Sequence, residues 1–159
     1  MDTLNKIDII ECNLDDPDQQ KAIVELTASY MADPMGGEDP MPENVRANLP
    51  QVLAAHPARL ILLAKDNDKY VGICTAFVGI STFYARPYFN VHDIAVLPAY
   101  RGKGIGRQLL ECLIEIARQR NYCKITLEVR HDNLPAQHLY RKLGFEDTKP
   151  PMYFWTKWL

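Results

Sequence analysis

A glycine-rich turn between a predicted strand and a predicted helix constrains this chain more than any other feature. The strand covers residues 90–97, and the helix covers 105–120, where apolar residues recur at helical spacing. Between them lies the run Arg101-Gly-Lys-Gly-Ile-Gly-Arg107. Such a turn exposes consecutive backbone N–H groups at a helix start, where the helix dipole also favours negative charge. The run therefore predicts a binding site for phosphate or pyrophosphate, with positive charge added by Arg101, Lys103 and Arg107.

The rest of the pattern predicts an α/β sandwich. Strands are expected over residues 5–12, 59–65, 70–83, 90–97, 124–130 and 152–159. Helices are expected over residues 17–30, 43–56, 105–120 and 135–143. The order β-α-α-β-β-β-α-β-α-β, without repeats or linkers, favours a single domain over 1–159 with helices packed on a mixed sheet. Gly144 is placed to end the last helix in a left-handed conformation.

Charge and cysteine usage exclude several classes of protein. The net charge of −2 argues against nucleic-acid or membrane partners, which attract proteins by long-range charge. The charge is uneven, since residues 1–50 hold eleven acidic and three basic side chains, and 101–130 hold seven basic and three acidic. The four cysteines show no metal-ligand spacing, so no metal is expected. The charged first ten residues do not resemble a signal peptide, which favours a cytoplasmic location.

The glycine run does not match the common nucleotide motifs. The dinucleotide pattern G-x-G-x-x-G fails at Arg107 when it starts at Gly102, and at Leu109 when it starts at Gly104. The P-loop pattern G-x-x-x-x-G-K-[ST] is absent. What remains is R-x-x-G-x-G over residues 101–106. This run resembles the pyrophosphate-binding motif of the GCN5-related N-acetyltransferases, which hold acetyl-coenzyme A.

The resemblance extends over about residues 60–159 and implies a GNAT-type α-β-α sandwich around a mixed, mostly antiparallel sheet. The run Asn133-Leu-Pro-Ala-Gln-His-Leu-Tyr-Arg-Lys-Leu-Gly-Phe145 is similar to the family's downstream segment. The resemblance implies that the strand before the glycine run offers its backbone to the pantetheine arm. It implies the following acetyl-CoA-binding residues: Ile94, Ala95, Val96, Arg101, Gly102, Lys103, Gly104, Ile105, Gly106, Arg107, Asn133, Ala136 and Tyr140.

The same resemblance implies direct acyl transfer from acetyl-CoA to an amine. Tyr140 would be the general acid, because a phenol with a reference pKa of ~10 can protonate the leaving thiolate. The backbone N–H of Val96 would polarise the thioester carbonyl. His92 is the first candidate for the base, on a strand face shared with Val96 by simple alternation, and Glu128 or a water is the alternative. The same alternation places Asp93 on the opposite face as a structural residue.

The acceptor is expected to be a primary amine on a small molecule or a peptide. Acidic residues of the loop after the first helix favour a cationic acceptor, unless they are a solvated surface: Asp33, Glu38 and Asp39. Aromatic residues are expected to supply an apolar wall of the acceptor site: Tyr30, Phe77, Phe83 and Tyr84. The alternative function is a non-catalytic acyl-CoA sensor of the same fold. A homodimer is compatible with either function.

Overall fold

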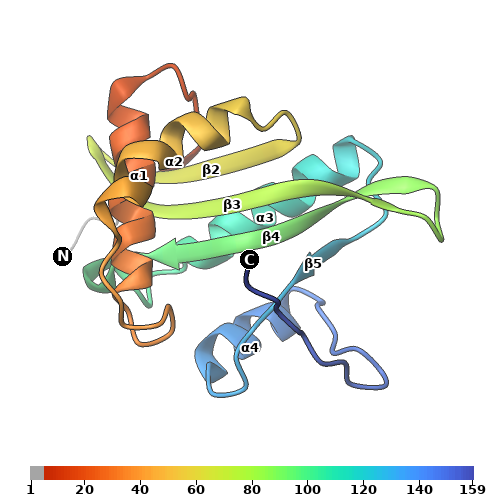
Figure 1. Ribbon diagram of the computed structural model, residues 1–159. Helices are drawn as coiled ribbons and strands as arrows, with labels where there is room; N and C mark the ends of the chain where they lie inside the picture. The colour runs from red at the N-terminus through yellow and green to blue at the C-terminus, as the bar shows by residue number, and fades with distance from the viewer. Residues whose placement is uncertain (1–5) are drawn as a thin grey trace. The chain divides into compact units, whose positions relative to one another are not determined.

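The computed structural model describes residues 6–159, which form five strands and four α-helices (Figure 1). The strands are β1 (Ile7–Glu11), β2 (Arg59–Asp66), β3 (Lys69–Ser81), β4 (Arg86–Val96) and β5 (Ile125–Leu127). The helices are α1 (Pro17–Met31), α2 (Glu43–Ala55), α3 (Ile105–Gln119) and α4 (Leu134–Lys142), with a 3₁₀ turn, η1, over Pro98–Tyr100. The chain divides into two compact units, Met1–Glu128 and Val129–Leu159. All five strands belong to the first unit, and α4 belongs to the second.

The strands form one mixed sheet in the order β1-β2-β3-β4-β5. The pairs β1–β2, β2–β3 and β3–β4 are antiparallel, whereas β5 runs parallel to β4. Antiparallel neighbours follow directly along the chain, but the parallel pair requires the crossover through α3. The predicted fold class, helices on a mixed and mostly antiparallel sheet, is confirmed.

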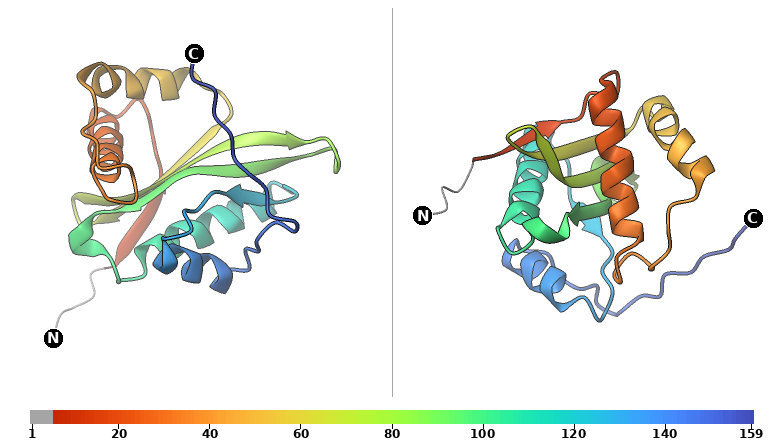
Figure 2. Two further views of the ribbon diagram at one scale, coloured as in Figure 1. Left: turned by 60° about the horizontal axis from the view of Figure 1, so that its bottom comes forward. Right: turned by 90° about the vertical axis from the view of Figure 1, so that its left-hand side faces the viewer.

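Helices cover both faces of the sheet (Figure 2). On one face, α1 and α2 pack through Ile23, Leu26 and Leu53 onto apolar side chains of β2 and β3. On the other face, α3 buries a stripe at helical spacing: Ile105, Leu109, Leu110 and Leu113. A Cβ on Gly72 of β3 would lie 3.3 Å from Ile105 Cγ2, so α3 begins in close contact with the sheet. This contact fixes the start of α3 beside the end of β4.

Local signals in the sequence explain where the helices begin and end. Asp16 caps α1, its carboxylate accepting the N–H of Asp18 at 2.9 Å, and Pro17 occupies the first turn where its missing N–H costs nothing. Gly144, with φ +88°, follows the C-cap of α4, as the sequence predicts.

The predicted strand over residues 152–159 is not formed, and the element order therefore ends at α4. A strand requires a partner to satisfy its N–H and C=O groups. This segment follows Pro150 and Pro151, which cannot donate hydrogen bonds, and its large apolar side chains are exposed, from Met152 at 74% to Trp158 at 89%. The strand predicted over 5–12 forms as β1, and residue 5 lies outside the described residues.

Within residues 6–159, no helix combines the length and apolarity that a membrane crossing requires, since the longest helices, α1 and α3, have 15 residues each.

We expect Leu113→Ala to destabilise the first unit by about 2–5 kcal/mol, because Leu113 is fully buried on the inner side of α3 and its truncation leaves a cavity. Urea unfolding followed by circular dichroism measures the change. Leu134→Ala is the matched control, since Leu134 is 66% exposed and its truncation should change stability by no more than about 0.5 kcal/mol. Equal effects for the two variants would contradict this assignment of the core.

Candidate functional site

The edge of β4 that faces away from β3 loses its partner halfway along the strand. β5 pairs with β4 only at Phe89, Asn90 and Val91. The antiparallel pairing with β3 on the other edge continues to Val96. Among the described residues, therefore, no strand pairs with this edge of β4 between residues 92 and 96. Unpaired strand backbone of this kind can hydrogen-bond an extended ligand as a neighbouring strand would.

Val96 presents its backbone to this open edge. The next residue, Leu97, donates its N–H to the Val71 carbonyl of β3 at 2.9 Å. Because successive residues in extended backbone point their polar groups to opposite edges, the N–H and C=O of Val96 face away from β3. The C=O accepts a hydrogen bond from Arg101 Nε at 3.1 Å. The N–H of Val96 is the group that remains directed at the open edge.

The glycine run forms an open turn at the start of α3. Gly102 and Gly104 have φ values of +76° and +77°, a region that favours glycine, and no atom lies within 4 Å of a Cβ built on either residue. The first hydrogen bond of α3 runs from the Gln108 N–H to the Gly104 carbonyl at 3.1 Å. The N–H groups of residues 105–107 precede that bond and have no acceptor in the helix. This arrangement suits an anion, as the sequence predicts.

The three cations of the run differ in how firmly they are held. Arg107 Nε pairs with Glu111 Oε1 at 2.7 Å, an exposed pair four residues apart that contributes only about 0.3–0.5 kcal/mol, so a phosphate can displace the glutamate. Lys103 Nζ lies 5.1 Å from the Tyr100 ring centroid. Arg101, in contrast, is bound to Val96 O and to Asp33 Oδ2, the latter at 2.7 Å. Its guanidinium therefore stabilises the turn from within.

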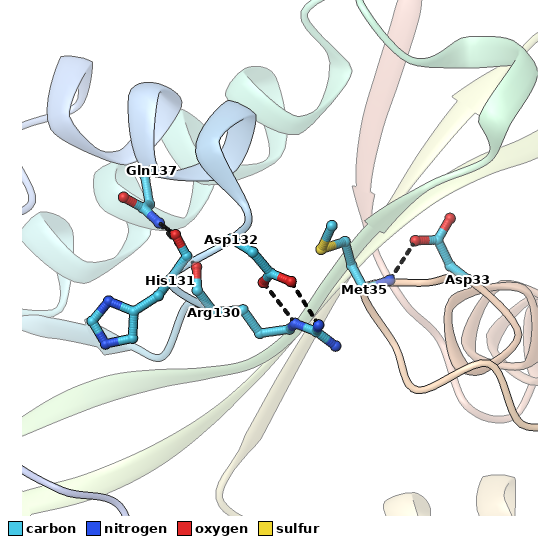
Figure 3. Close-up of polar contacts among 6 residues, drawn as sticks. All are labelled: Asp33, Met35, Arg130, His131, Asp132 and Gln137. Atoms are coloured by element: carbon cyan, nitrogen blue, oxygen red, sulfur yellow. Dashed lines mark hydrogen bonds and ion pairs between the residues drawn. The ribbon is translucent and has the colours of Figure 1, made fainter.

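Asp33 organises the loop that follows α1. Its carboxylate accepts the N–H of Met35 at 3.0 Å (Figure 3), and its backbone carbonyl accepts three further N–H groups of the loop, from Gly36, Gly37 and Glu38. The N–H of Met35 and then the guanidinium of Arg101 lower the pKa of Asp33. Asp33 is thus a charged, 13% exposed loop anchor that is already paired, and the expectation that it attracts a cationic acceptor is not supported.

A β-bulge changes the faces of β4 that the sequence predicts. Ala76 pairs with Val91 and Thr75 pairs with Asp93, so His92 is the extra residue between them. Simple alternation predicted His92 and Val96 on one face and Asp93 on the other. The register keeps Asp93 and Val96 on opposite faces, because Asp93 pairs with Thr75 on the face where Phe77 joins the core of α1 and α2. The ring of His92 contacts Phe77 on that same face, so the prediction that His92 shares a face with Val96 is wrong. Bulges cannot be read from alternation, and they often redirect side chains next to active sites.

His92 and Asp93 therefore share one surface of the sheet. His92 is exposed and its ring meets the Phe77 ring edge-on, with centroids 5.6 Å apart. Asp93 is half-buried, and its side chain makes no hydrogen bond or ion pair among residues 6–159. Burial raises the pKa of Asp93, an effect that the neighbouring His92 partly offsets. The sequence analysis interpreted Asp93 as a structural residue, and the structure adds it to the candidates for this site.

The second unit presents the remaining predicted residues. Asn133 is the N-cap of α4, and its Oδ1 accepts the N–H of Ala136 at 3.3 Å. The turn before it is held by Gln137, whose amide donates to the carbonyls of Arg130 and His131 at 2.9 Å (Figure 3). Tyr140, one turn after Ala136, is buried with its ring 5.8 Å from that of Phe145.

Other candidates have structural partners or remain exposed. Asn90 Nδ2 donates to Thr126 Oγ1 at 3.0 Å, which ties β4 to β5 at the middle of their three paired positions. Glu128 is exposed one residue after β5. No group of three or more His, Cys, Asp or Glu side chains within residues 6–159 is arranged to hold a metal ion.

Comparison with known proteins identifies this arrangement. The model of the acetyltransferase (GNAT) family matches residues 23–145, which include the open edge of β4, the glycine turn and α4. The chain belongs to the acetyltransferase (GNAT) family.

Curated relatives of this GNAT chain match about half of it. The N-alpha-acetyltransferase RimI of Mycobacterium tuberculosis is 43% identical over 91 residues, which cover 53% of the chain and 56% of that protein. The streptothricin acetyltransferase of Streptomyces lavendulae is 39% identical over 74 residues, which cover 46% of the chain and 39% of that protein. The chain spans about half the length, or less, of the curated relatives it matches first.

Solved structures share the GNAT fold over almost the whole chain. A probable acetyltransferase superposes with a TM-score of 0.80 at 22% identity, covering 94% of this chain and 97% of that one. An aminoglycoside acetyltransferase from an uncultured soil metagenomic sample, in complex with trehalose, also gives 0.80 at 16% identity, covering 98% and 99%. At these identities the likeness establishes the fold.

We expect Asp93→Asn to stabilise this GNAT domain at pH 8. Because burial raises the pKa of Asp93, ionisation costs the folded state more than the unfolded chain. That cost is present above the folded pKa and disappears as the pH falls toward the reference value of ~3.9. For a domain of this size each kcal/mol of stability corresponds to about 2–4 °C in Tm. Thermal unfolding at pH 8 and pH 4 should show a gain that shrinks with pH.

Asp33→Asn is the matched control, with the opposite sign. The pKa of Asp33 is lowered, so its charge stabilises the fold above the reference pKa, and that stability is lost as the pH falls. Asp33→Asn should lower Tm at pH 8. A lower Tm for Asp93→Asn at pH 8 would contradict the assigned burial of its carboxylate.

Proposed function

We propose that this chain is an acetyl-CoA-dependent N-acetyltransferase that moves an acetyl group to a primary amine. The observation that carries the proposal is the open edge of β4, which leads directly into the open glycine turn at the start of α3. An extended thiol-bearing arm and a pyrophosphate, joined in one molecule, match that pair of features. Membership of the GNAT family and relatives described as acetyltransferases support the same function.

The first unit supplies most of the proposed coenzyme contacts. The backbone of Ile94, Ala95 and Val96 hydrogen-bonds the pantetheine arm along the open edge. The turn holds the pyrophosphate through its unpaired N–H groups and the side chains of Lys103 and Arg107, with the following residues in the cradle: Gly102, Gly104, Ile105 and Gly106. Arg101 contributes by holding the turn through Val96 O and Asp33. The family resemblance adds Asn133, Ala136 and Tyr140 of the second unit.

In the proposed reaction the amine attacks the thioester carbonyl carbon while both substrates are bound. His92 takes the proton that the amine loses, directly or through a water, and Glu128 or water alone is the alternative base. The Val96 N–H donates to the carbonyl oxygen as negative charge develops. The Tyr140 phenol protonates the coenzyme A thiolate as the carbon–sulfur bond breaks.

The cysteines support direct transfer without an acyl-enzyme. Burial raises the pKa of Cys12 to about 11 and that of Cys74 to about 12. Burial also raises the pKa of Cys112. These thiols stay protonated near neutral pH, and a thiol is a far weaker nucleophile than a thiolate.

Coenzyme A should raise the melting temperature of the protein, because a ligand that binds only the folded state adds about 2.7 kcal/mol of stability at a hundred times its Kd. Differential scanning fluorimetry with coenzyme A, ATP and NAD measures this effect. A shift with ATP or NAD but none with coenzyme A would refute the proposed function. Tight coenzyme A binding without thiol release in the presence of any amine would favour the acyl-CoA sensor.

Tyr140→Phe should lower kcat by about 10²–10⁴-fold and leave the Kd for coenzyme A nearly unchanged, because it removes only the proton donor. Thiol release and calorimetric binding measure the two quantities. Tyr122→Phe is the control, since Tyr122 packs against Phe89 and has no proposed part in the reaction. An unchanged kcat for Tyr140→Phe would exclude Tyr140 as the acid.

A further inference from the structure

An apolar pocket lies where α2 ends against β3. It is a shallow depression, wide open to solvent, with a volume of about 530 Å³. The lining residues are Val52, Leu53, Ala55, His56 and Phe77. No acidic or basic side chain other than His56 takes part in the lining. A ligand seated in this pocket would therefore present an uncharged, apolar group to it.

Two ring contacts connect the pocket to the candidate base, His92. His56, at the C-terminal end of α2, meets the Phe77 ring edge-on with centroids 5.1 Å apart. Phe77 in turn meets His92, the bulged residue of β4, with centroids 5.6 Å apart. Phe77 is thus shared between the pocket wall and the strand on which the proposed transfer occurs.

The strand that contributes Phe77 to the pocket and its neighbour β4 carry one carboxylate between them. β3 and β4 together contain a single acidic residue, Asp93. It lies opposite Thr75, two residues from Phe77 on the same face of β3, and has no hydrogen-bond or ion-pair partner in the part of the chain that the structure describes. Asp33, by contrast, is neutralised by Arg101. Asp93 can therefore form an ion pair with one ammonium group, and β3 and β4 offer no carboxylate for a second one.

We propose that the acceptor is a monoamine carried on an apolar group, such as an arylalkylamine or a peptide with an apolar N-terminal residue. Asp93 binds the ammonium group, and the pocket behind Phe77 receives the apolar group. This inference rests on the proposed function and names the substrate class of the same site. It sets aside polyamines and other multiply charged acceptors, which need several carboxylates.

The spacing of the two features suits such a molecule. Diagonal neighbours on paired strands have Cβ atoms about 7–8 Å apart, and Phe77 and Asp93 stand in this relation through Thr75. A short aliphatic link between an amine and an apolar group spans that distance. His92, between them along the sheet, lies where it can take the proton of the bound amine.

The experiment measures thiol release from acetyl-CoA with 2-phenylethylamine, a peptide beginning with leucine, and spermidine. We expect kcat/KM for one or both apolar amines to exceed that for spermidine by at least about tenfold, a discrimination typical of an apolar pocket. The phenylethylamine and peptide arms distinguish a small-molecule acceptor from a peptide one. A wild-type preference for spermidine would overturn the proposal.

Two variants test the residues, each by a change that the fold tolerates. Val52→Asp places a carboxylate in the pocket at a residue that is 63% exposed, and should lower kcat/KM for the apolar amines by on the order of tenfold while raising that for spermidine. Ile80→Asp, at a residue 65% exposed outside the pocket, is the matched control and should leave both values unchanged. Equal effects of the two changes would overturn the proposal.

Asp93→Asn should raise KM for the apolar amines by at least about tenfold and leave the Kd for coenzyme A unchanged. If Asp93 were purely structural, its substitution would not change KM for the amines without also changing the Kd for coenzyme A. An unchanged KM would overturn the role of Asp93 in binding the ammonium group. If no amine is acetylated although coenzyme A binds, the proposed function fails. NMR titration of the coenzyme A-bound protein with 2-phenylethylamine then tests whether the pocket binds the amine. Chemical-shift changes at Phe77 and His56 would support binding there, and their absence would overturn it.

Discussion

Hydrogen bonds from β5 reach β4 only at Phe89, Asn90 and Val91, and beyond this point the outer edge of β4 has no strand partner among the described residues. The backbone there is held in place by β3 on the other side, so it stays extended and ordered while its outward groups remain open. The Asn90–Thr126 hydrogen bond joins the two strands one residue before their last paired position, Val91 and Leu127. A ligand that runs along this edge replaces the missing strand and meets the glycine turn at its end. The coenzyme site proposed for this chain thus depends on where the pairing between β4 and β5 ends.

The charges near the glycine turn suit one bound anion. Arg107 has an exposed partner that a phosphate can displace, whereas Arg101 is held by Asp33 and by Val96 O. The same ion pair connects the glycine turn to the loop after α1, which Asp33 organises through its backbone carbonyl. One cation of the basic segment, Arg101, is therefore already engaged in contacts within the protein, and the N-terminus of α3 adds to the attraction for an anion.

The proposed acceptor site differs from the glycine turn because it is mainly apolar. Apolar and aromatic side chains from α2, β3 and β4 meet at Phe77, and Asp93 is the one carboxylate of the two central strands. Burial of the Asp93 carboxylate lowers stability, a cost that the neighbouring His92 partly offsets. Residues that lower the stability of a fold are concentrated at functional sites.

The sequence by itself determined the glycine turn, α3 and most strand positions, because glycine conformations, helix caps and hydrophobic periodicity act locally. It also led to the GNAT family through motifs whose order is linear. Only the tertiary structure decided the faces of β4, since a bulge inserts one residue and puts His92 on the face of Phe77 and Asp93 instead of the face of Val96. It likewise paired Asp33 with Arg101, 68 residues away, and left 152–159 without a strand. These features depend on contacts between segments that are distant in the sequence, and local sequence patterns do not reveal such contacts.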